Sequence, residues 1–136
     1  MKLTIFTDGG ARGNPGPAGI GATIKNEAGV LISQVSEYIG EATNNVAEYM
    51  AVIAAIEKAK ELGATEIDFF LDSLLVVEQL NGNYKVKNAG LASLFVKVYN
   101  ARQAFKKVTF AHVRREQNQE ADALVNLALD KKLGLL

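Results

Sequence analysis

The chain has 136 residues, of which 49% are hydrophobic, and this length and composition fit one folded domain with its own core. Its 15 basic residues balance 15 acidic residues, and the resulting net charge of zero argues against indiscriminate attraction to nucleic acid. The chain has no cysteine, which excludes disulfides, a thiol nucleophile and a cysteine-based zinc site, and no apolar stretch is long enough for a membrane span.

The start of the chain bears on where the protein works. Met1 and Lys2 lead directly into a strand-forming run, so we expect no signal peptide. The lack of cysteine also suits a reducing compartment. We therefore expect a cytoplasmic protein. We also expect a monomer that forms a single domain over residues 1–136, without internal repeats or linkers.

The first stretch, LTIFTDGGARGNPGP from Leu3 to Pro17, combines a strand, a carboxylate and a turn. Strand-forming residues predict a strand over 2–8 that ends at Asp8, and the glycines, asparagine and prolines that follow predict a turn. An acid beside glycine N–H groups, which a ligand can approach closely, suits a site for a metal and a phosphate. The alternative at this point is that Asp8 only starts a turn.

Two more strands are expected over 18–25 and 30–39, joined by a hairpin turn at 26–29. The later of the two alternates poorly between apolar and polar residues, which indicates an edge position or a β-bulge. Together with the first strand they form a meander, which is followed by a turn over 40–45.

A helix follows that turn and ends near Leu62, because Gly63 is a favourable terminator. Three neighbouring polar residues can cap its start: Thr43, Asn44 and Asn45. Glu48 lies on the helical face that must point to the sheet, together with the apolar residues Val52, Ala55, Ile56 and Ala59. Because burying an unpaired carboxylate is costly, an inward Glu48 needs a partner. The alternative is an exposed first-turn glutamate, which the helix dipole favours.

A strand over 67–71 comes next and ends at Asp72. Since a helix precedes this strand, a right-handed crossover makes it parallel to the first one, and Asp8 and Asp72 then lie at the same edge of neighbouring strands. Carboxylates that converge repel each other and need a cation or a shared proton between them. Taken alone, Asp72 is also explained as the N-cap of a helix over 73–80.

The rest of the chain alternates loops with regular structure. A loop over 81–88 precedes a helix over 89–105, a strand over 107–113 and a polar loop over 114–117. The last helix begins at Glu116 or Asn118 and runs to about Lys132. Asp122 borders the apolar face of this helix, although alone it is also explained as an ordinary first-turn aspartate.

Four acids therefore stand out: Asp8, Glu48, Asp72 and Asp122. Carboxylates are the hard oxygen ligands that Mg²⁺ and Mn²⁺ prefer, and the single histidine, His112, cannot build a zinc site. Clustered acids that hold two such ions about 4 Å apart suit in-line displacement at phosphorus. The pattern thus predicts a metal-dependent site for phosphoryl chemistry, without an organic cofactor.

Four motifs resemble, in their order and spacing, those of the type 1 ribonuclease H (ribonuclease HI) family. They are TDGGARGNPGPAGIG at 7–21, TNNVAEYMA at 43–51, DS at 72–73 and NQEADAL at 118–124. The resemblance covers nearly the whole chain. It implies an α/β, ribonuclease H-like fold, with a five-stranded mixed sheet in the order 3-2-1-4-5 flanked by helices. It also implies hydrolysis of the RNA strand of an RNA–DNA hybrid, which leaves a 5′-phosphate and a 3′-hydroxyl.

The resemblance further implies roles for single residues. The four acids match the metal-binding residues of the family, with two ions per site, one activating the attacking water and the other stabilising the leaving 3′ oxygen. Glu48 is also implied to lie near the ribose 2′-hydroxyl. The positions implied to contact the hybrid are Gly9, Gly10, Asn14, Thr43, Asn44, Asn45, Ser73, Arg114 and Arg115.

Two departures place the chain with the short subgroup of the family. The basic helical insertion of many members is replaced by the loop 81–88, so we expect weaker hybrid affinity unless other basic residues compensate. The candidates for this compensation are Lys85, Lys87, Arg102, Lys106 and Lys107. The flexible histidine loop of many members is also short here. We interpret His112 as structural, with Arg114 or Arg115 taking over a phosphate contact.

Two other classes of function are open from the residues alone. A nucleic-acid-binding module on the same fold could have lost catalysis, but it would gain nothing from four acids that repel one another. A phosphotransfer or nucleotide-binding domain could use the Asp8-Gly9-Gly10 segment as a phosphate loop. A domain of 136 residues leaves little room for the second half of such folds, and no Walker-type lysine motif is present.

Overall fold

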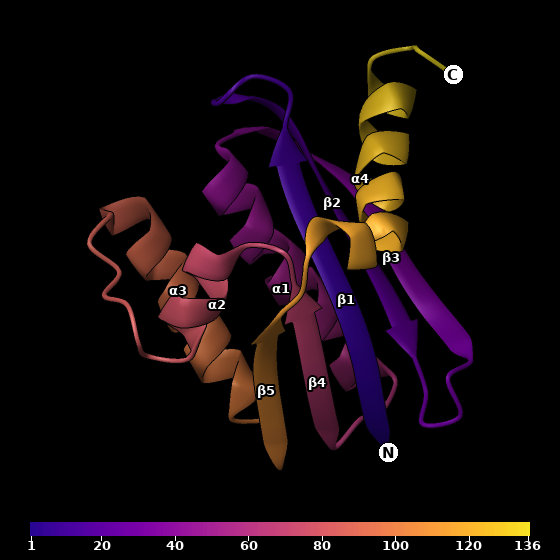
Figure 1. Ribbon diagram of the computed structural model, residues 1–136, viewed down its shortest axis with the longest axis vertical. Helices are drawn as coiled ribbons and strands as arrows, with labels where there is room; N and C mark the ends of the chain where they lie inside the picture. Colours follow the sequence, from indigo (N-terminus) through magenta and orange to yellow (C-terminus); the bar gives the residue numbers. More distant parts are fainter.

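The computed structural model describes residues 1–136 and contains one five-stranded sheet in the order β3-β2-β1-β4-β5, as the sequence predicted (Figure 1). The strands are β1 (Lys2–Ala11), β2 (Gly16–Lys25), β3 (Leu31–Ala42), β4 (Glu66–Leu71) and β5 (Lys107–His112). The helices are α1 (Asn44–Glu61), α2 (Leu74–Leu80), α3 (Ala89–Arg102) and α4 (Gln119–Lys132), with a short 3₁₀ turn, η1 (Arg115–Gln117), before α4. None of the helices has the length and hydrophobicity that a transmembrane segment requires.

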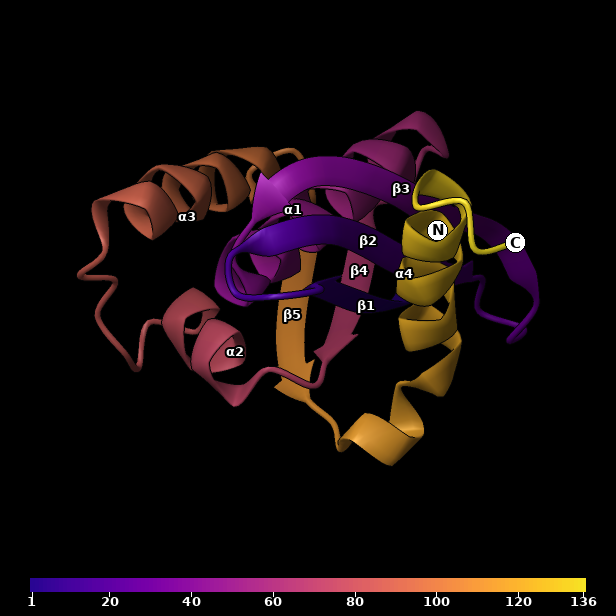
Figure 2. The ribbon, with the colours of Figure 1, turned by 90° about the horizontal axis from the view of Figure 1, so that it is seen from above.

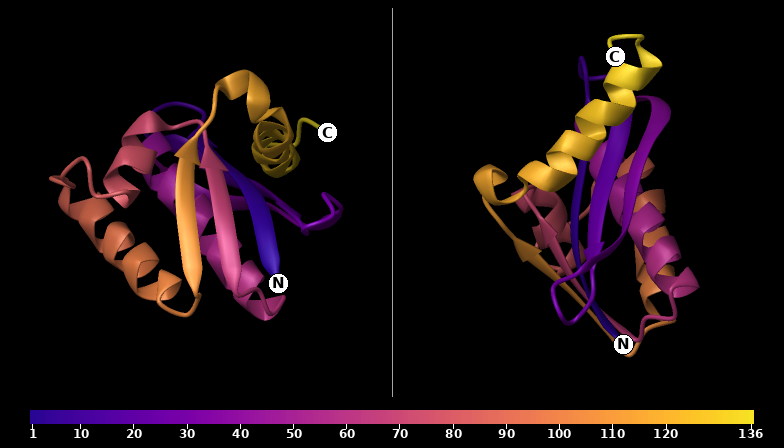
Figure 3. Two further views of the ribbon diagram at one scale, coloured as in Figure 1. Left: turned by 60° about the horizontal axis from the view of Figure 1, so that its bottom comes forward. Right: turned by 90° about the vertical axis from the view of Figure 1, so that its right-hand side faces the viewer.

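The sheet is mixed, and β1 is its central strand. β1 pairs antiparallel with β2 and parallel with β4, and β5 continues the parallel half. Helices α1, α2 and α3 cover one face, whereas α4 lies alone on the other face (Figure 3). Because the carboxyl ends of β4 and β5 point to the same edge as the start of α1, this edge collects residues that are distant in the sequence.

The main core lies between the sheet and α1. Alternate apolar residues of β1 and β4 are fully buried, which is the period-two pattern of strands covered by a helix. On α1, the predicted inward residues Val52, Ala55, Ile56 and Ala59 are all buried, and this confirms the predicted helical face. Phe69 of β4 stacks on Phe110 of β5, with ring centroids 5.3 Å apart, and extends the core under α3.

The first strand is longer than the sequence indicated. The prediction that β1 ends at Asp8 in a glycine turn is wrong, because Gly9 and Gly10 pair with Ile20 and Gly19 of β2. Only the parallel pairing with β4 stops at Thr7, one residue before the acid. A side chain at Gly9 would place its Cβ 2.3 Å from the carbonyl of Ala47, so this glycine allows α1 to approach the sheet, not a turn to form.

The edge strand β3 also runs further than expected. Its pairing with the start of β2 extends to Ala42, so the predicted turn over 40–45 is wrong, and α1 begins almost directly after the strand. The predicted edge position and irregularity are confirmed, since β3 has one partner and its register shifts twice. Of the three candidate caps, Thr43 is the N-cap of α1, and its hydroxyl accepts a hydrogen bond from the N–H of Val46 (3.2 Å).

Three smaller boundaries differ from the prediction. Ser73, not Asp72, caps α2, and its hydroxyl accepts from the N–H of Val76 at 3.3 Å. Helix α3 ends at Arg102 instead of Phe105, and the polar loop before α4 contains η1. The cap at Ser73 matters most, because it leaves the carboxylate of Asp72 free for other contacts.

Candidate active site

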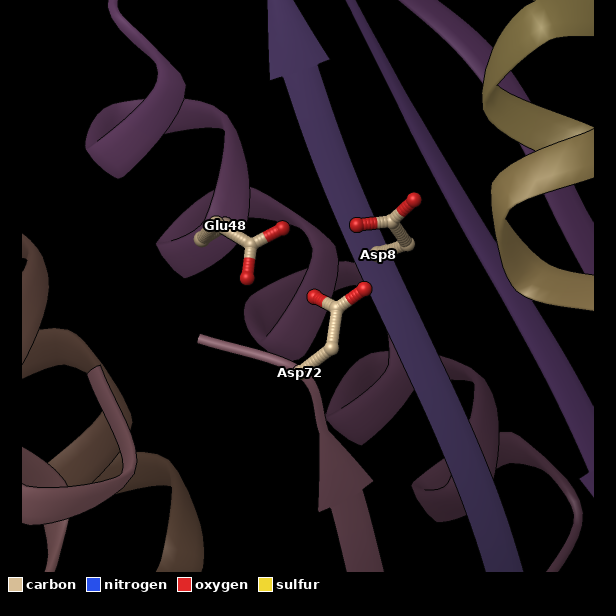
Figure 4. Close-up of side chains that lie close together, drawn as sticks. All are labelled: Asp8, Glu48 and Asp72. Atoms are coloured by element: carbon tan, nitrogen blue, oxygen red, sulfur yellow. The ribbon is translucent and has the colours of Figure 1, made fainter. Parts of the chain in front are cut away.

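Three carboxylates from distant parts of the chain converge at the carboxyl edge of the parallel strands (Figure 4). Asp8 comes from β1, Glu48 from the second turn of α1, and Asp72 from the residue after β4. One oxygen of each lies within 4.8 Å of the others. The parallel register places Thr7 beside Leu71, which brings Asp8 and Asp72 level with each other.

Glu48 is fixed in place by the close contact between β1 and α1. Its side chain is only 5% exposed, and its Oε1 accepts a hydrogen bond of 2.6 Å from the N–H of Gly9. Its other oxygen, Oε2, is buried and has no hydrogen-bond partner in the protein. A buried carboxylate oxygen without a donor carries a large desolvation cost, so this oxygen is poised to accept a cation.

Asp122 approaches the same cleft from the opposite face of the sheet. It is exposed, and it lies on the first turns of α4, where the side-chain amide of Asn126 contacts its Oδ2 at 3.4 Å. Asn118 ties the start of α4 to β1, because its amide donates to the carbonyl of Thr7 at 2.9 Å, next to Asp8. All four predicted acids therefore line one cleft, but Asp122 stands outside the tight group of three.

Burial and mutual repulsion disfavour ionisation of the inner acids. Burial raises the pKa of Asp8 to about 7, and the charges of Asp72 and Asp122 oppose its ionisation further. Burial also raises the pKa of Glu48 well above its usual range, with the neighbouring Asp8 as the next cause. Keeping several carboxylates close together without a positive side chain among them therefore lowers the stability of the folded protein.

The residues fit a divalent metal. The group supplies only carboxylate oxygens as ligands, and these oxygens lie close enough together to bind the same ion. In addition, Oε2 of Glu48 receives no hydrogen bond from the protein. Mg²⁺ and Mn²⁺ prefer such ligands and keep positions open for water or phosphate oxygens. Of the two expectations for converging carboxylates, a cation or a shared proton between Asp8 and Asp72, the geometry is compatible with the cation.

Most of the predicted substrate residues surround these acids. The cleft has a volume of about 470 Å³, and it is lined by Gly9, Gly10, Asn44, Asn45, Ser73 and Arg115 in addition to the acids. Asn44 and Asn45 also line a second, adjoining groove, which contains the predicted Asn14 and Thr43. Arg114 lines neither hollow. His112 is exposed at the end of β5 and also lies outside both.

Two of the predicted asparagines also have structural contacts. The side-chain oxygen of Asn14 accepts from the N–H of Asn44 at 3.0 Å, and the side-chain oxygen of Asn44 accepts from the N–H of Ala11 at 2.8 Å. These bonds join the β1–β2 connection to the start of α1. They hold the rim of the cleft in one arrangement before any ligand arrives.

One polar contact along α4 was not predicted from the sequence. Arg12, from the β1–β2 connection, pairs with Asp130 at 2.7 Å, donates to Asn126 at 3.2 Å and lines the cleft. Asp122, Asn126 and Asp130 follow one another at intervals of four residues, so they lie on one face of the helix. That spacing is the signal in the sequence that could have identified the face. Asn88, the N-cap of α3, was missed as part of the adjoining groove.

Comparisons with known proteins agree with this fold. The family described as reverse transcriptase-like matches residues 6–128. A ribonuclease H of Ruthia magnifica subsp. Calyptogena magnifica is 33% identical over 144 residues, which cover 96% of this chain and 97% of the relative. The bifunctional protein Rv2228c of Mycobacterium tuberculosis is 44% identical over 131 residues, and the match covers 96% of this chain but 36% of that longer relative.

A solved structure extends the comparison to three dimensions. The crystal structure of LC11-RNase H1 in complex with an RNA/DNA hybrid has 46% sequence identity to this chain and a TM-score of 0.92. The match covers 96% of this chain and 99% of that chain. The chain thus has the fold of the reverse transcriptase-like proteins, and within them it belongs to the type 1 ribonuclease H family, as its motifs predicted.

Proposed function

We propose that the protein is a metal-dependent endonuclease that hydrolyses the RNA strand of RNA–DNA hybrids and leaves 5′-phosphate and 3′-hydroxyl ends. The observation that supports this most directly is the group of three carboxylates, in which Oε2 of Glu48 is buried without a partner. A fold that needed only to bind nucleic acid would not keep such a group, because its repulsion costs stability. Family membership and the hybrid complex of LC11-RNase H1 support the same substrate.

The four acids would together bind the metal ions. Asp8, Glu48 and Asp72 would hold two Mg²⁺ or Mn²⁺ ions, with Asp122 completing the set from α4. When bound, such ions provide a water with a lowered pKa and neutralise the charge on the leaving oxygen. The Gly9 N–H keeps Glu48 oriented toward the cleft, and Asn126 restrains the carboxylate of Asp122. The buried Glu48 is therefore a rigid ligand, whereas the exposed Asp122 is a more adjustable one.

The rest of the cleft suits a backbone of sugars and phosphates. Gly9, Gly10, Asn44, Asn45 and Ser73 offer small or neutral polar groups, which can reach sugars and minor-groove edges without selecting one sequence. Arg115 adds a positive charge to the lining. We propose these residues, with Asn14 and Thr43 in the adjoining groove and Arg114 beyond it, as the hybrid-contacting surface.

The phosphate-loop alternative loses support from the geometry. Gly9 and Gly10 lie inside β1, paired with β2, and the N–H of Gly9 already donates to Glu48. A phosphate loop needs free N–H groups at an open turn. The cytoplasmic location and the monomeric state stay predictions from the sequence.

The decisive experiment is cleavage of an end-labelled RNA–DNA hybrid with Mg²⁺, with Mn²⁺ and with EDTA, beside single-stranded RNA, double-stranded RNA and duplex DNA. We expect cutting only in the RNA of the hybrid and only with a metal. Mapping the product ends tests the proposed chemistry separately. If folded protein binds the hybrid but cuts it with neither metal, the binding-module alternative replaces this proposal.

A further inference from the structure

The five basic residues that could replace the missing helical insertion separate into two groups. Arg102, Lys106 and Lys107 lie at the end of α3 and the start of β5, which is the end of the sheet opposite the acids (Figure 1). Lys85 and Lys87 belong to the loop between α2 and α3, whose last residue, Asn88, lines the groove next to the acidic cleft. Figure 2 shows this loop on the outer side of α2 and α3. Only the second group lies on a segment that leads into the groove beside the acids.

The loop that carries these two lysines is held at three points. At its start, the N–H groups of Asn83 and Tyr84 both donate to the carbonyl of Glu78, at 2.9 and 3.2 Å. In its middle, Val86 packs against the main core. At its end, the side-chain oxygen of Asn88 accepts from the N–H of Leu91 at 3.1 Å and caps α3.

These anchors determine where the lysines point. Val86 is turned inward, so its neighbours Lys85 and Lys87 are exposed on the outside of the same short segment. Neither lysine takes part in a salt bridge, whereas Lys2, Lys25 and Lys58 each have an acidic partner. Two uncompensated cations on an anchored backbone lose little further backbone entropy when they meet a charged ligand.

A continuous polar surface connects the loop with the acids. The acidic cleft and the adjoining groove share Asn44 and Asn45, and the groove continues to Asn88, directly after Lys87. The groove has no charged residue in its lining. A polyanion that follows this surface away from the acids therefore meets no repulsion before it reaches the two lysines.

We propose that Lys85 and Lys87 form a second phosphate-contacting element, which extends the hybrid-binding surface beyond the catalytic cleft and takes the place of the missing basic insertion. This inference rests on the proposed function, since the polyanion is the RNA–DNA hybrid. Arg102, Lys106 and Lys107 have no part in hybrid binding. The two lysines add affinity without sequence preference, because phosphate contacts position a nucleic acid but do not read its bases.

The test compares two double variants of matched charge, Lys85→Gln/Lys87→Gln and Lys106→Gln/Lys107→Gln. Hybrid affinity is measured by fluorescence anisotropy over a series of salt concentrations, in Ca²⁺ or EDTA so that binding is separated from cleavage. For Lys85→Gln/Lys87→Gln we expect about fivefold weaker binding at low salt. The negative slope of the logarithm of the binding constant against the logarithm of the salt concentration becomes shallower by roughly two, about one for each lost phosphate contact. The Lys106→Gln/Lys107→Gln variant behaves like the wild type.

The outcomes separate this inference from the proposed function. If the wild type binds and cleaves hybrids but Lys85→Gln/Lys87→Gln keeps the wild-type affinity and salt slope, the inference is wrong and the function stands. Equal losses in the two double variants also overturn it, because they would show a general charge effect. If the wild type neither binds nor cleaves hybrids, the proposed function itself fails. Thermal unfolding of all variants checks that the exposed substitutions leave the fold intact, and Lys85→Glu/Lys87→Glu should enlarge the loss.

Discussion

The surroundings of acidic residues shift their pKa in opposite directions at the two ends of the sheet. At the carboxyl edge of the parallel strands, called the catalytic edge below, burial raises the pKa of Asp8 and Glu48. No basic side chain belongs to this group of acids. Further down β4, Asp68 accepts a hydrogen bond of 2.6 Å from the hydroxyl of Thr109 and lies 3.0 Å from Nζ of Lys2. The Thr109 hydrogen bond, with the help of Lys2, lowers the pKa of Asp68.

This difference separates acids that serve the fold from acids that serve the site. Asp68 gains from its neighbours when it is charged, so its charge favours the folded state. The inner acids at the catalytic edge would be more stable apart, and the contact between β1 and α1 forces them together at Gly9. Their arrangement therefore supports the proposed site independently of the sequence motifs, and five substitutions test the contrast.

The largest effect is expected on cleavage. Asp8→Asn keeps the size of the side chain but removes a ligand from the tight group, so we expect the rate of hybrid cleavage to fall by at least about 10³-fold with the fold intact. Asp122→Asn changes an exposed residue outside that group, and a loss of roughly tenfold is expected. Initial rates with Mg²⁺ and with Mn²⁺ measure both. Near-normal cleavage by Asp8→Asn would refute the assignment of the site.

The second effect concerns the contact that brings Glu48 to the site. In Gly9→Ala, the new Cβ would lie 2.3 Å from the backbone of Ala47, so α1 must move away from β1. We expect a loss of about 3 kcal/mol in the free energy of unfolding, measured by urea denaturation. Gly10→Ala is the matched control, because its nearest neighbour would be 3.9 Å away, and its stability should change by less than about 0.5 kcal/mol. Equal stability of the two variants would contradict this account of Gly9.

The third effect is a pH dependence of the metal-free protein. The pKa of Asp8 is raised to about 7 and that of Glu48 is also raised, so the folded state keeps protons that the unfolded state releases. The stability linked to these protons is full below the ordinary carboxyl pKa of about 4. It is lost as the pH rises through about 7.

Asp8→Asn removes one of the ionising groups, so the variant loses less stability than the wild type as the pH rises. In EDTA at pH 8 we expect the variant to be more stable than the wild type by on the order of 1 kcal/mol, with the difference closing near pH 4. Melting temperatures across this pH range measure it, and Mg²⁺ should raise the melting temperature of the wild type more than that of the variant. A wild type that is more stable than Asp8→Asn at pH 8 without metal would show that the acids are not strained.

The smallest effect is expected at the other end of the sheet, and its sign is opposite. The lowered pKa of Asp68 means that its contribution is present above the ordinary carboxyl pKa and is lost as the pH falls through the folded-state value. Asp68→Asn should therefore destabilise the protein at neutral pH, by less than about 1 kcal/mol because the pair with Lys2 is partly exposed. Thermal unfolding at pH 7 and at low pH measures this, and a gain in stability at pH 7 would contradict it.

Much of the site could be predicted because its residues obey local rules. The apolar face of α1 placed Glu48 inward, and a crossover between parallel strands placed Asp72 beside Asp8. The extent of β1 could not be predicted, since glycines favour turns unless a partner strand and a packed helix hold them in an extended conformation. The alternative in which Asp72 caps α2 differs from the structure by one residue, because Asp72 and Ser73 are both good caps and only the start of the helix distinguishes them.

The sequence by itself determined the family, because its motifs are written in neighbouring residues, and the resemblance that they carry implied the order of the strands. The same motifs gave the four candidate acids. Only the tertiary structure decided that three acids form a tight group while Asp122 stays exposed. It also decided that the loop with Lys85 and Lys87 leads into the groove beside the acids, whereas Lys106 and Lys107 lie at the other end of the sheet. The physical reason is that these facts depend on how closely helices approach the sheet and on how a loop is anchored. Such distances arise from packing between segments that are far apart in the chain.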